Sequence, residues 1–496
     1  MSKRSQQIDA FFRQGQQLHM AGADTLLSQA IALRTAAEFR LTHAAALIAL
    51  NRPVSAAELL SQVLRARPND AAAWQTLGHA LSDSAQAAAA IEAYANALRL
   101  RPDLPDIRNN LGTALRQAGR LEEAEAELRQ APPDPYALVN LSSVQKERAR
   151  FTEAEETLRQ ALQLAPQHPV LRYNWALLML LLDRPAEAWD GWEHRFAANA
   201  VPRRAFAEPQ WRGEPLGDRT LLVHFEQGLG DTLQFCRYLP ALPGKVMFEA
   251  PPQLIRLLSS NPAMPILVPA GNRMPAFDVV APLLSLPART RIAPAQPPYL
   301  FAEADRVAQW RERIGSHGIR VGIAWQGFSG RHEDKGRSLP LAAFKPLADI
   351  PGVRLISLQK GEGEEQLAAA SFAVETLDGL DAGADAFLDT AAVMTVVDLM
   401  VTSDTSIAHL AGALDRPVWV ALRHVPDWRW LLDRTDSPWY PSMRLFRQQR
   451  DGAWGAVFDT MAEALRAMPQ RSAAQRSADQ QSAPQQPVVQ QPMGRA

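Results

Sequence analysis

Cysteine and net charge are both nearly absent from this sequence, and each absence excludes a class of protein. One cysteine, Cys236, occurs in 496 residues, which leaves no internal disulfide framework and no cysteine-rich zinc site. The formal net charge is −1, so bulk electrostatics favour neither nucleic acid nor an anionic membrane surface as a partner. Hydrophobic residues make up 47% and charged residues 21%, which fits two or three globular domains with sizeable cores.

Long apolar runs are missing as well. The most apolar stretch near the middle of the chain is WALLMLLL at residues 175–182, which is too short to span a bilayer. Residues 1–17 contain no apolar core of the length that a signal peptide needs. We therefore expect no membrane span and a cytoplasmic protein, which the single cysteine fits.

What the sequence does have, before residue 200, is an internal repeat. Three series of residues share one period of 34 residues, in which one unit is shortened to 30. They are the prolines Pro68, Pro102, Pro132 and Pro166, the small residues Ala90, Ala124, Ala154 and Ala188, and the bulky residues Tyr94, Leu128, Leu158 and Trp192. Three series with one period and one deletion indicate a repeated structural unit.

This spacing resembles the tetratricopeptide repeat, in which each unit is a pair of helices. A small residue lets the second helix approach the first, a bulky residue fills the gap, and proline ends the second helix before the next unit. The alternative is an alanine-rich helical bundle with accidental phasing. The repeat predicts an α-solenoid over residues 36–200, preceded by capping helices over 1–35, and a groove that binds a protein or peptide.

The pattern changes after a connector rich in Pro, Gly and Arg at residues 196–219. Short apolar runs now alternate with helical patterns, which predicts buried parallel strands. The runs are TLLVHF, KVMFEA, FDVVAP, RVGIAW, VRLISL, VDLMVTS and PVWVAL. A segment rich in proline and alanine near residue 305 interrupts them, so we predict two α/β domains, over 205–305 and 306–465. A glutamine- and proline-rich tail over 470–496 is expected to be disordered.

The first candidate site is the stretch GLGD at residues 228–231, which lies between an apolar run and a helical pattern. Backbone N–H groups at such a helix N-terminus bind anions. The stretch is not a dinucleotide fingerprint, because Leu233 replaces its third glycine, and no Gly-Lys-Ser/Thr follows to make a P-loop. Asp231 is either a helix N-cap or a reacting group, and the stretch alone leaves both open.

A second cluster follows the apolar run VDLMVTS. The strand gives way to a helix at Asp404, Thr405 and Ser406, on the edge where open α/β sheets bind ligands. His409 lies one turn into that helix, on the same face as Thr405. The alternative is an ordinary capped helix with a hydrogen-bonded histidine.

A third cluster is the loop AWQGFSGRHEDKGRS, which follows the run RVGI. Its cations Arg331, Lys335 and Arg337 suit a diphosphate, because arginine forms bidentate contacts with phosphate oxygens. The alternative is a solvated surface loop. A fourth strand end, SLQKG, contributes Gln359 and Lys360.

Together these segments resemble one family. EQGLGDTLQFCRYLPAL, VGIAWQG…RS, SLQKG, DTAAVMTVVDLMVTSDTSIAHLAGAL and DWRWLLDRTDSPWYPSMRLFRQ are similar to the glycosyltransferase domain of bacterial tetratricopeptide-repeat proteins related to the heptosyltransferases (glycosyltransferase family 9-like). The resemblance covers roughly residues 205–450. It implies a GT-B fold, in which two Rossmann-like domains face each other across a cleft, and therefore an α + α/β fold class for the whole chain.

The resemblance also implies roles for residues. Asp231 would be the general base, and no metal or cofactor is expected beyond the donor substrate, a nucleotide-diphosphate sugar. The residues implied in donor binding are Gly230, Gln326, Gly327, Arg331, Lys335, Arg337, Gln359, Lys360, Asp404, Thr405, Ser406 and His409. The phosphate-binding lysine of the heptosyltransferases has no fixed match, so Lys335 or Arg337 takes its place. The donor sugar therefore stays open among heptose, hexose and N-acetylhexosamine.

Two function classes follow. In the first, Asp231 takes the proton of an acceptor hydroxyl, and the helix that starts near Thr405 stabilises the departing nucleoside diphosphate together with the loop cations. A base opposite the leaving group implies inversion, and the repeats present a protein or peptide acceptor. In the second, the protein is an inactive repeat scaffold or a nucleotide-sugar sensor. A nucleotide-sugar epimerase is a weaker third hypothesis, since a free sugar gives no reason for a peptide groove.

Two further features are interpreted as structural. The segment PDWRWLLDRTDSPWYPSMRLFRQ holds four large aromatics, which we expect in the core rather than stacked on a sugar. The acidic run DGLDAGAD at residues 378–385 is expected to be a loop and not a metal-binding pair of carboxylates.

Overall fold

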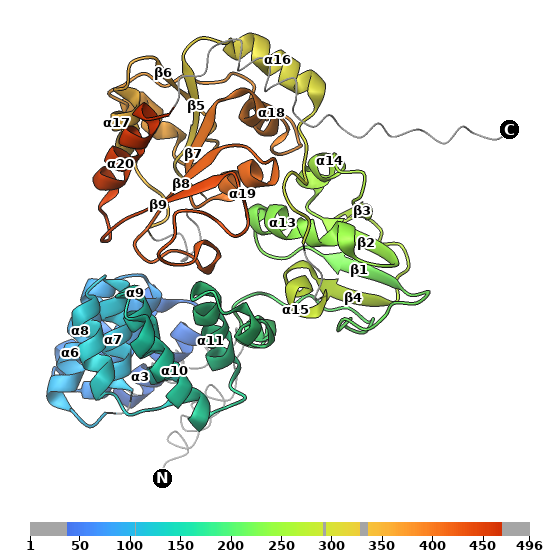
Figure 1. The fold of residues 1–496 in the computed structure, drawn as a ribbon. Helices are drawn as coiled ribbons and strands as arrows, with labels where there is room; N and C mark the ends of the chain where they lie inside the picture. Colours follow the sequence, from blue (N-terminus) through green and yellow to red (C-terminus); the bar gives the residue numbers. More distant parts are fainter. Residues whose placement is uncertain (1–36, 105, 291–293, 328–335, 469–496) are drawn as a thin grey trace. The chain divides into compact units, whose positions relative to one another are not determined.

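The computed structural model describes residues 37–104, 106–290, 294–327 and 336–468 (Figure 1). The chain divides into two compact units, Met1–Leu178 and Met179–Ala496. The capping helices predicted over 1–35 and the tail predicted over 470–496 lie outside the described residues. Within the described ranges, no helix combines the length and the apolar character that crossing a membrane requires.

The first unit is a run of helices in which each of the first seven packs against the next, and the last helix extends past Leu178 into the second unit. The helices are α3 (Ala37–Ala49), α4 (Pro53–Ala66), α5 (Ala71–Asp83), α6 (Ala87–Leu100), α7 (Ile107–Gln117), α8 (Leu121–Gln130), α9 (Pro135–Glu147), α10 (Phe151–Leu164) and α11 (Pro169–Leu181). The predicted α-solenoid is confirmed.

Glycines in the first helix of a unit explain the shared period of small and bulky residues. A Cβ atom on Gly78 of α5 would lie 2.5 Å from the Tyr94 ring of α6. A Cβ on Gly112 of α7 would lie 2.5 Å from Leu128 of α8. Each small residue therefore lets the second helix approach, and the bulky partner fills the space, as the spacing predicts.

The shortened repeat unit lacks one turn of its second helix. The helix α8 has 10 residues, where α6 and α10 each have 14. After it the chain turns through Pro132 and Pro133, and the Asp134 carboxylate accepts hydrogen bonds from two backbone N–H groups at the start of α9. Asp134 is thus the N-cap that starts the next unit without the missing turn.

The second unit contains two parallel sheets. The first has the order β3-β2-β1-β4 and consists of β1 (Thr220–His224), β2 (Lys245–Ala250), β3 (Ile266–Pro269) and β4 (Val279–Pro282). The second has the order β6-β5-β7-β8-β9 and consists of β5 (Ile319–Ala324), β6 (Val353–Ser357), β7 (Leu399–Ser403), β8 (Val418–Leu422) and β9 (Met443–Arg447). All the pairings within these sheets are parallel, which confirms the predicted α/β class.

Each of the seven predicted apolar runs contains a strand, and two strands were missed. The first missed strand, β3, has four residues, and Ile266 at its start is 66% exposed. The second, β9, has the sequence MRLFR, whose arginines break the apolar run. Both lie at the edge of a sheet, where one side of the strand is free of a neighbour and less apolar sequence is tolerated.

Helices precede, connect and follow the strands of the second unit. They are α12 (Trp189–Trp192), α13 (Leu229–Phe235), α14 (Ile255–Leu258), α15 (Leu286–Thr290), α16 (Ala304–Ile314), α17 (Lys345–Ala348), α18 (Leu388–Val396), α19 (Ser406–Ala413) and α20 (Trp454–Arg466). Helix α16 begins beside the predicted boundary near residue 305 and packs against α18, which precedes β7 of the second sheet.

Residues 179–200, predicted as the end of the repeat array, fall in the second unit. Trp192, the last bulky residue of the repeat series, donates its indole N–H to the Leu284 carbonyl at 3.0 Å. Arg195 forms a fully buried ion pair with Glu226 at 2.8 Å. The end of the periodic pattern is therefore anchored on the first sheet, because its aromatic and charged side chains have their partners there.

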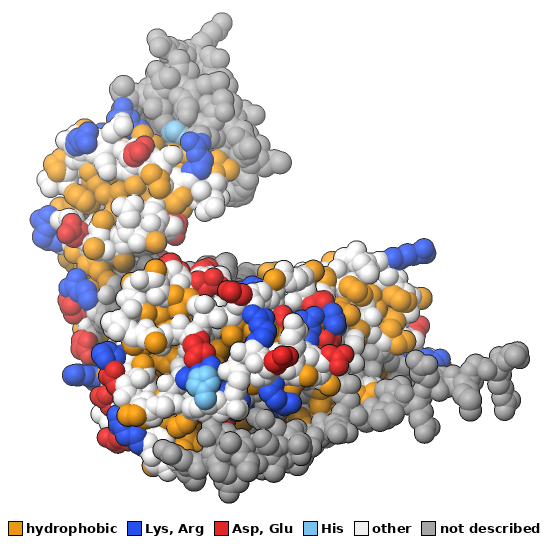
Figure 2. All heavy atoms as spheres, turned by 90° about the horizontal axis from the view of Figure 1, so that it is seen from above, with side chains coloured by type: hydrophobic (Ala, Val, Ile, Leu, Met, Phe, Trp, Pro, Cys, Tyr) orange, Lys and Arg blue, Asp and Glu red, His pale blue; other side chains and the backbone are white. Residues whose placement is uncertain are grey.

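Charged side chains of both signs are mixed on the surface. On the face shown in Figure 2, Lys and Arg side chains lie among Asp and Glu side chains and do not gather into one area of a single sign. Surface pairs such as Arg256 with Glu303 and Arg434 with Asp436 account for part of this mixture. The distribution matches the net charge of −1.

Candidate functional site

Two of the predicted clusters meet at the starts of α13 and α19. These helices follow β1 and β7, one from each sheet, and pack against each other (Figure 1). Gly230 lies in the first turn of α13, where a Cβ atom would lie 3.2 Å from His409 and 3.3 Å from the Ser406 backbone. A Cβ at position 230 would be a tight contact, and His409 or the start of α19 would have to shift by a few tenths of an ångström, so glycine suits this close approach of the helices. Sequence stretches more than 170 positions apart thus form one site at the carboxyl ends of the two sheets.

Asp231 has a capping role, although it is not the N-cap residue. The N-cap of α13 is Gly228, and Asp231 lies three residues further along, where its Oδ2 accepts a hydrogen bond from the Gly228 N–H at 2.9 Å. The sequence offered Asp231 as the N-cap residue, whereas the N-cap is Gly228 and Asp231 is the third residue of the helix. This bond holds the carboxylate at the helix start and leaves the second carboxylate oxygen, Oδ1, to a different partner.

The partner of that oxygen is Arg429, which the sequence analysis missed. Its Nη2 donates to Asp231 Oδ1 at 2.6 Å, and its Nε donates to Gln234 Oε1 at 2.6 Å. Arg429 lies in the short 3-10 helix η9 (Trp428–Trp430), after β8, and its guanidinium stacks over the Trp428 ring at 4.4 Å. The sequence does show an arginine between two tryptophans, Trp428 and Trp430, but we assigned this segment to the core and not to the site.

Burial and charge act in opposite directions on this pair. Burial raises the pKa of the Asp231 carboxyl, and the Arg429 guanidinium opposes that rise. Burial acts to lower the pKa of Arg429, but the carboxylates of Asp427 and Asp231 outweigh it, so the pKa is raised. The arginine therefore keeps its charge beside a carboxyl group that burial alone would favour as the neutral acid.

Asp404 and Arg337 are brought together at the end of β7. Arg337 donates through Nη2 to the Asp404 backbone carbonyl at 2.7 Å, and its Nε lies 3.6 Å from the Asp404 carboxylate. Burial raises the pKa of the Asp404 carboxyl, against the lowering effect of Arg337. Thr405 is the N-cap of α19, its hydroxyl lies 3.3 Å from that of Thr402, and Ser406 begins the helix.

His409 lies inside the protein, as the hydrogen-bonded alternative described. Its Nδ1 is 3.0 Å from the Tyr440 hydroxyl, and its ring stacks on Trp430 with centroids 5.3 Å apart. Burial lowers the pKa of His409 to about 3, so the ring is neutral at physiological pH. The His409 ring packs close to Gly230 within α19, and because it is neutral it offers no positive charge to an anion.

The strand ends after β5 and β6 are joined by Gln359. Its Oε1 accepts from the backbone N–H groups of Trp325 and Gln326, at 2.9 and 3.0 Å. Its Nε2 donates to the backbone carbonyls of Gln326 and Glu362. These bonds make Gln359 a clamp between two loops, and its role in donor binding stays a prediction.

Of the remaining predicted residues, some have defined contacts and others lie outside the described residues. Lys360 donates its Nζ to the Leu380 carbonyl at 2.7 Å, which ties it to the acidic run. The Gly327 N–H lies 3.4 Å from the Ser338 hydroxyl, at the two ends of the basic loop. Arg331 and Lys335, the two other cations of that loop, lie outside the described residues.

Of the two features interpreted as structural, the aromatic segment has three of its four large aromatics in the core and Trp439 partly buried, and the acidic run is a loop as predicted. Trp430 and Tyr440 are fully buried, and Trp428 is 5% exposed. In the acidic run, the Asp381 carboxylate accepts bonds from the start of α18, which makes it a capping loop. Among the described residues, no group of three or more His, Cys, Asp or Glu side chains is arranged to hold a metal ion.

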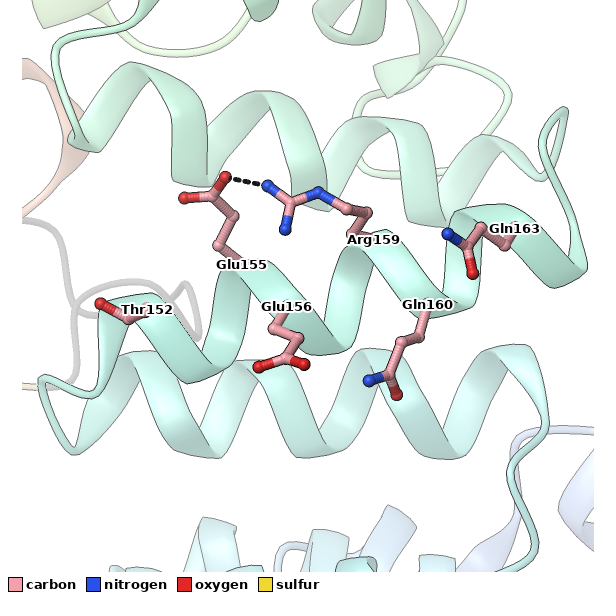
Figure 3. A pocket seen from close by; sticks show the side chains of 6 residues that line it. All are labelled: Thr152, Glu155, Glu156, Arg159, Gln160 and Gln163. Atoms are coloured by element: carbon pink, nitrogen blue, oxygen red, sulfur yellow. Dashed lines mark hydrogen bonds and ion pairs between the residues drawn. The ribbon is translucent and has the colours of Figure 1, made fainter.

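The repeat unit has surface hollows around α10. One, of about 380 Å³, lies on the exposed face of that helix, where the side chains of Glu155 and Arg159 form an ion pair (Figure 3). It is lined by Thr152, Glu155, Glu156, Arg159, Gln160 and Gln163. A second, of about 400 Å³, lies where α8 is short, with Pro132 and Leu138 in its wall, and shares Glu156 and Gln160 with the first.

The family models that match this chain fall in this unit, whereas one curated relative aligns with most of the chain. The sequence model of the tetratricopeptide repeat matches residues 76–137 and 135–168. The first unit contains tetratricopeptide repeats. Protein FlbA of Caulobacter vibrioides is 28% identical over 467 residues, which cover 85% of this chain and 72% of that protein.

Solved structures are similar to the repeats. The tetratricopeptide-repeat protein TTC0263 of Thermus thermophilus is 21% identical with a TM-score of 0.31, covering 35% of this chain and 99% of that one. MamA of Desulfovibrio magneticus is 18% identical with a TM-score of 0.30, covering 33% and 95%.

Proposed function

We propose that this protein is a nucleotide-sugar-dependent glycosyltransferase of the GT-B fold, inverting and independent of metal, whose repeats bind the protein or peptide acceptor. The observation that carries the proposal is the contact between the starts of α13 and α19 through Gly230. It brings Asp231 and the Asp404-Thr405-Ser406 turn together at the carboxyl ends of two parallel sheets. Ligands of open α/β sheets bind at such edges.

The chemistry of the proposal needs two functions at this place. A base must take the proton of the acceptor hydroxyl as the oxygen attacks the anomeric carbon, and Asp231 supplies a carboxylate for it. The nucleoside diphosphate that departs must be stabilised by positive charge. The N-terminus of α19 and Arg337, which is bonded to the Asp404 carbonyl, supply that charge.

A specific observation favours the alternative, a scaffold or nucleotide-sugar sensor without turnover. Both oxygens of the Asp231 carboxylate already have partners, the Gly228 N–H and Arg429. A carboxylate oxygen can accept a second hydrogen bond, so a hydroxyl can still approach Oδ1. A transferase would consume the donor that it binds, and a sensor would not, so donor consumption distinguishes the two functions.

The test uses nucleotide-diphosphate sugars with UDP, GDP, dTDP and ADP, each incubated with the full-length protein and host lysate. Thermal shift reports binding, and release of the nucleotide reports turnover. We expect one donor both to stabilise the protein and to be consumed. Binding without release would favour the sensor, and no binding to any donor would contradict the proposal.

Asp231→Asn tests the base. Loss of a general base lowers the rate by about 10²–10⁴-fold, while the donor-induced thermal shift should persist because the amide keeps the shape. The matched control is Asp349→Asn, which removes an exposed carboxylate paired with Lys345 and should leave the rate unchanged. Wild-type turnover in Asp231→Asn would show that Asp231 is not the base.

A further inference from the structure

All three guanidinium nitrogens of Arg429 donate hydrogen bonds, two of them to α13 and the third within its own segment. Its Nη2 and Nε bond Asp231 and Gln234 of α13, and its Nη1 bonds the Asp427 carboxylate at 2.9 Å. The side chain is only 10% exposed, and its guanidinium lies over the ring of Trp428. A residue between β8 and β9 of the second sheet is thereby fixed onto α13, the helix that follows β1 of the first sheet.

The backbone of Arg429 is held as firmly as its side chain. Asp427 is the N-cap of η9 and accepts the Arg429 N–H at 3.1 Å. The Trp439 indole donates to the Arg429 carbonyl at 2.8 Å. Because both ends of the residue are fixed, the guanidinium presents one nitrogen to Asp231 in one direction, and the carboxylate is restrained by Gly228 on its other side.

Among the groups around Asp231, Arg429 stabilises the ionised carboxylate of Asp231 most. Burial acts against ionisation, and so do the neighbouring carboxylates of Asp427 and Glu226, whereas the Arg429 charge and the Gly228 N–H act for it. The titratable and charged groups of the surrounding elements are Glu226 before α13, Asp427 and Arg429 in and before η9, Asp404 and His409 at α19, and Arg337 beside Asp404.

We propose that Arg429 is a positioning residue for Asp231, which holds that carboxylate ionised and in one orientation at the meeting point of the two sheets. The inference that this readies a base for the acceptor hydroxyl rests on the proposed glycosyltransferase function. The ion pair itself does not depend on it. Oδ1 keeps a second lone pair for the hydroxyl while it accepts from Arg429.

The test compares Arg429→Gln and Arg429→Lys in the full-length protein, with nucleotide release measured from pH 5 to 9. Turnover rises with pH as Asp231 ionises, and loss of the positive charge moves that rise to higher pH. We expect a shift of about one pH unit in Arg429→Gln, which is about a tenfold loss of rate on the acid limb, with recovery at high pH. Arg429→Lys should restore part of the shift.

The control is Arg434→Gln, which breaks an exposed ion pair with Asp436 in the same segment and should leave the profile in place. A loss of rate in Arg429→Gln that is equal at every pH, with a normal circular dichroism spectrum, would overturn the proposal. A raised KM for the donor at an unmoved pH limb would also overturn it and make Arg429 a donor contact.

A second readout needs no turnover and separates failure of this inference from failure of the proposed function. Carbodiimide and glycine ethyl ester label protonated carboxyl groups, and mass spectrometry of the peptide that contains Asp231 gives its labelling against pH. We expect the midpoint to be higher in Arg429→Gln than in the wild type. Equal midpoints would overturn the inference, whereas a wild type inactive with every donor would contradict only the proposed function.

Discussion

The two units of the chain differ in the sequence separation of the contacts that stabilise each of them. In the repeat unit, Asn140 donates to Asn109 in the preceding repeat, 31 positions away. In the α/β unit, Arg429 bonds Asp231 across 198 positions. Contacts between neighbouring repeats make stability a sum of local terms, whereas long-range contacts tie a whole unit into one cooperative structure. A substitution in the repeats should therefore stay local, and one in the α/β core should not.

The largest expected effect comes from breaking a buried ion pair of the α/β unit. Arg195 is 0% exposed and Glu226 is 4% exposed, so Arg195→Ala leaves a buried carboxylate without its cation. We expect a loss of about 3–5 kcal/mol in the free energy of unfolding. Urea denaturation followed by tryptophan fluorescence measures it.

The matched control for that change is Arg184→Ala, which removes a partly exposed partner of Glu187 just before Trp189. Pairs of this kind are worth about 0–1 kcal/mol, so the denaturation midpoint should move little. If the two variants lost equal stability, the contrast between a buried cooperative core and a tolerant surface would be wrong.

A second effect, intermediate in size, comes from pH. Burial lowers the pKa of His409 to about 3 and of His224 to about 4, whereas both take a proton near pH 6.5 when unfolded. The folded state then binds fewer protons than the unfolded state, so stability is complete above pH 6.5 and falls below it. Each histidine should cost about 1.4 kcal/mol at pH 5.5.

Urea denaturation of the α/β unit at pH 7.5 and 5.5 measures that loss. His409→Gln, compared with its own stability at pH 7.5, should lose less on acidification than the wild type, because one of the two titrating groups is gone. An unchanged difference between the two pH values would show that His409 does not contribute.

The smallest effect tests locality in the repeats. Gly78→Ala places a Cβ 2.5 Å from the buried Tyr94 ring, and overpacking of this kind costs about 1–3 kcal/mol. The better helix propensity of alanine returns about 1 kcal/mol, so a net loss of about 1 kcal/mol is expected.

Hydrogen exchange should show faster opening of α5 and α6, with protection of β1 and β7 unchanged. Gly119→Ala is a control of a different kind, since a Cβ there meets nothing within 4 Å and only its positive φ of 78° opposes the change. Loss of protection in the sheets after Gly78→Ala would contradict the local character of the repeats.

The features that sequence analysis found are those that a short stretch of chain determines. The repeat phase was visible because Ala90 and Tyr94 recur with their equivalents one unit later. The starts of α13 and α19 were visible because a buried strand, small residues and a helix follow each other directly. Strand β3 was missed because four residues, one of them exposed, carry almost no pattern.

The centre of the site could not be found in this way. Nothing near Arg429 in the sequence indicates that its guanidinium bonds Asp231 and Gln234 of a different sheet. Tertiary packing also gives two of the predicted site residues contacts that the sequence analysis did not foresee. Gln359 joins two loops, and His409 is buried and neutral, since their partners are backbone groups and aromatic rings that the local pattern does not reveal.

The short helix α8 shows how a solenoid of this kind can change in length during evolution. Four residues correspond to about one turn of an α-helix, so their removal shortens the helix and rotates the face that the next helix packs against by only about 40°. Deletions of one or two residues would turn that face by about 100° per residue and misalign every later unit. Viable length changes in the array therefore come in steps of whole turns, and each step leaves a recess such as the one beside Pro132.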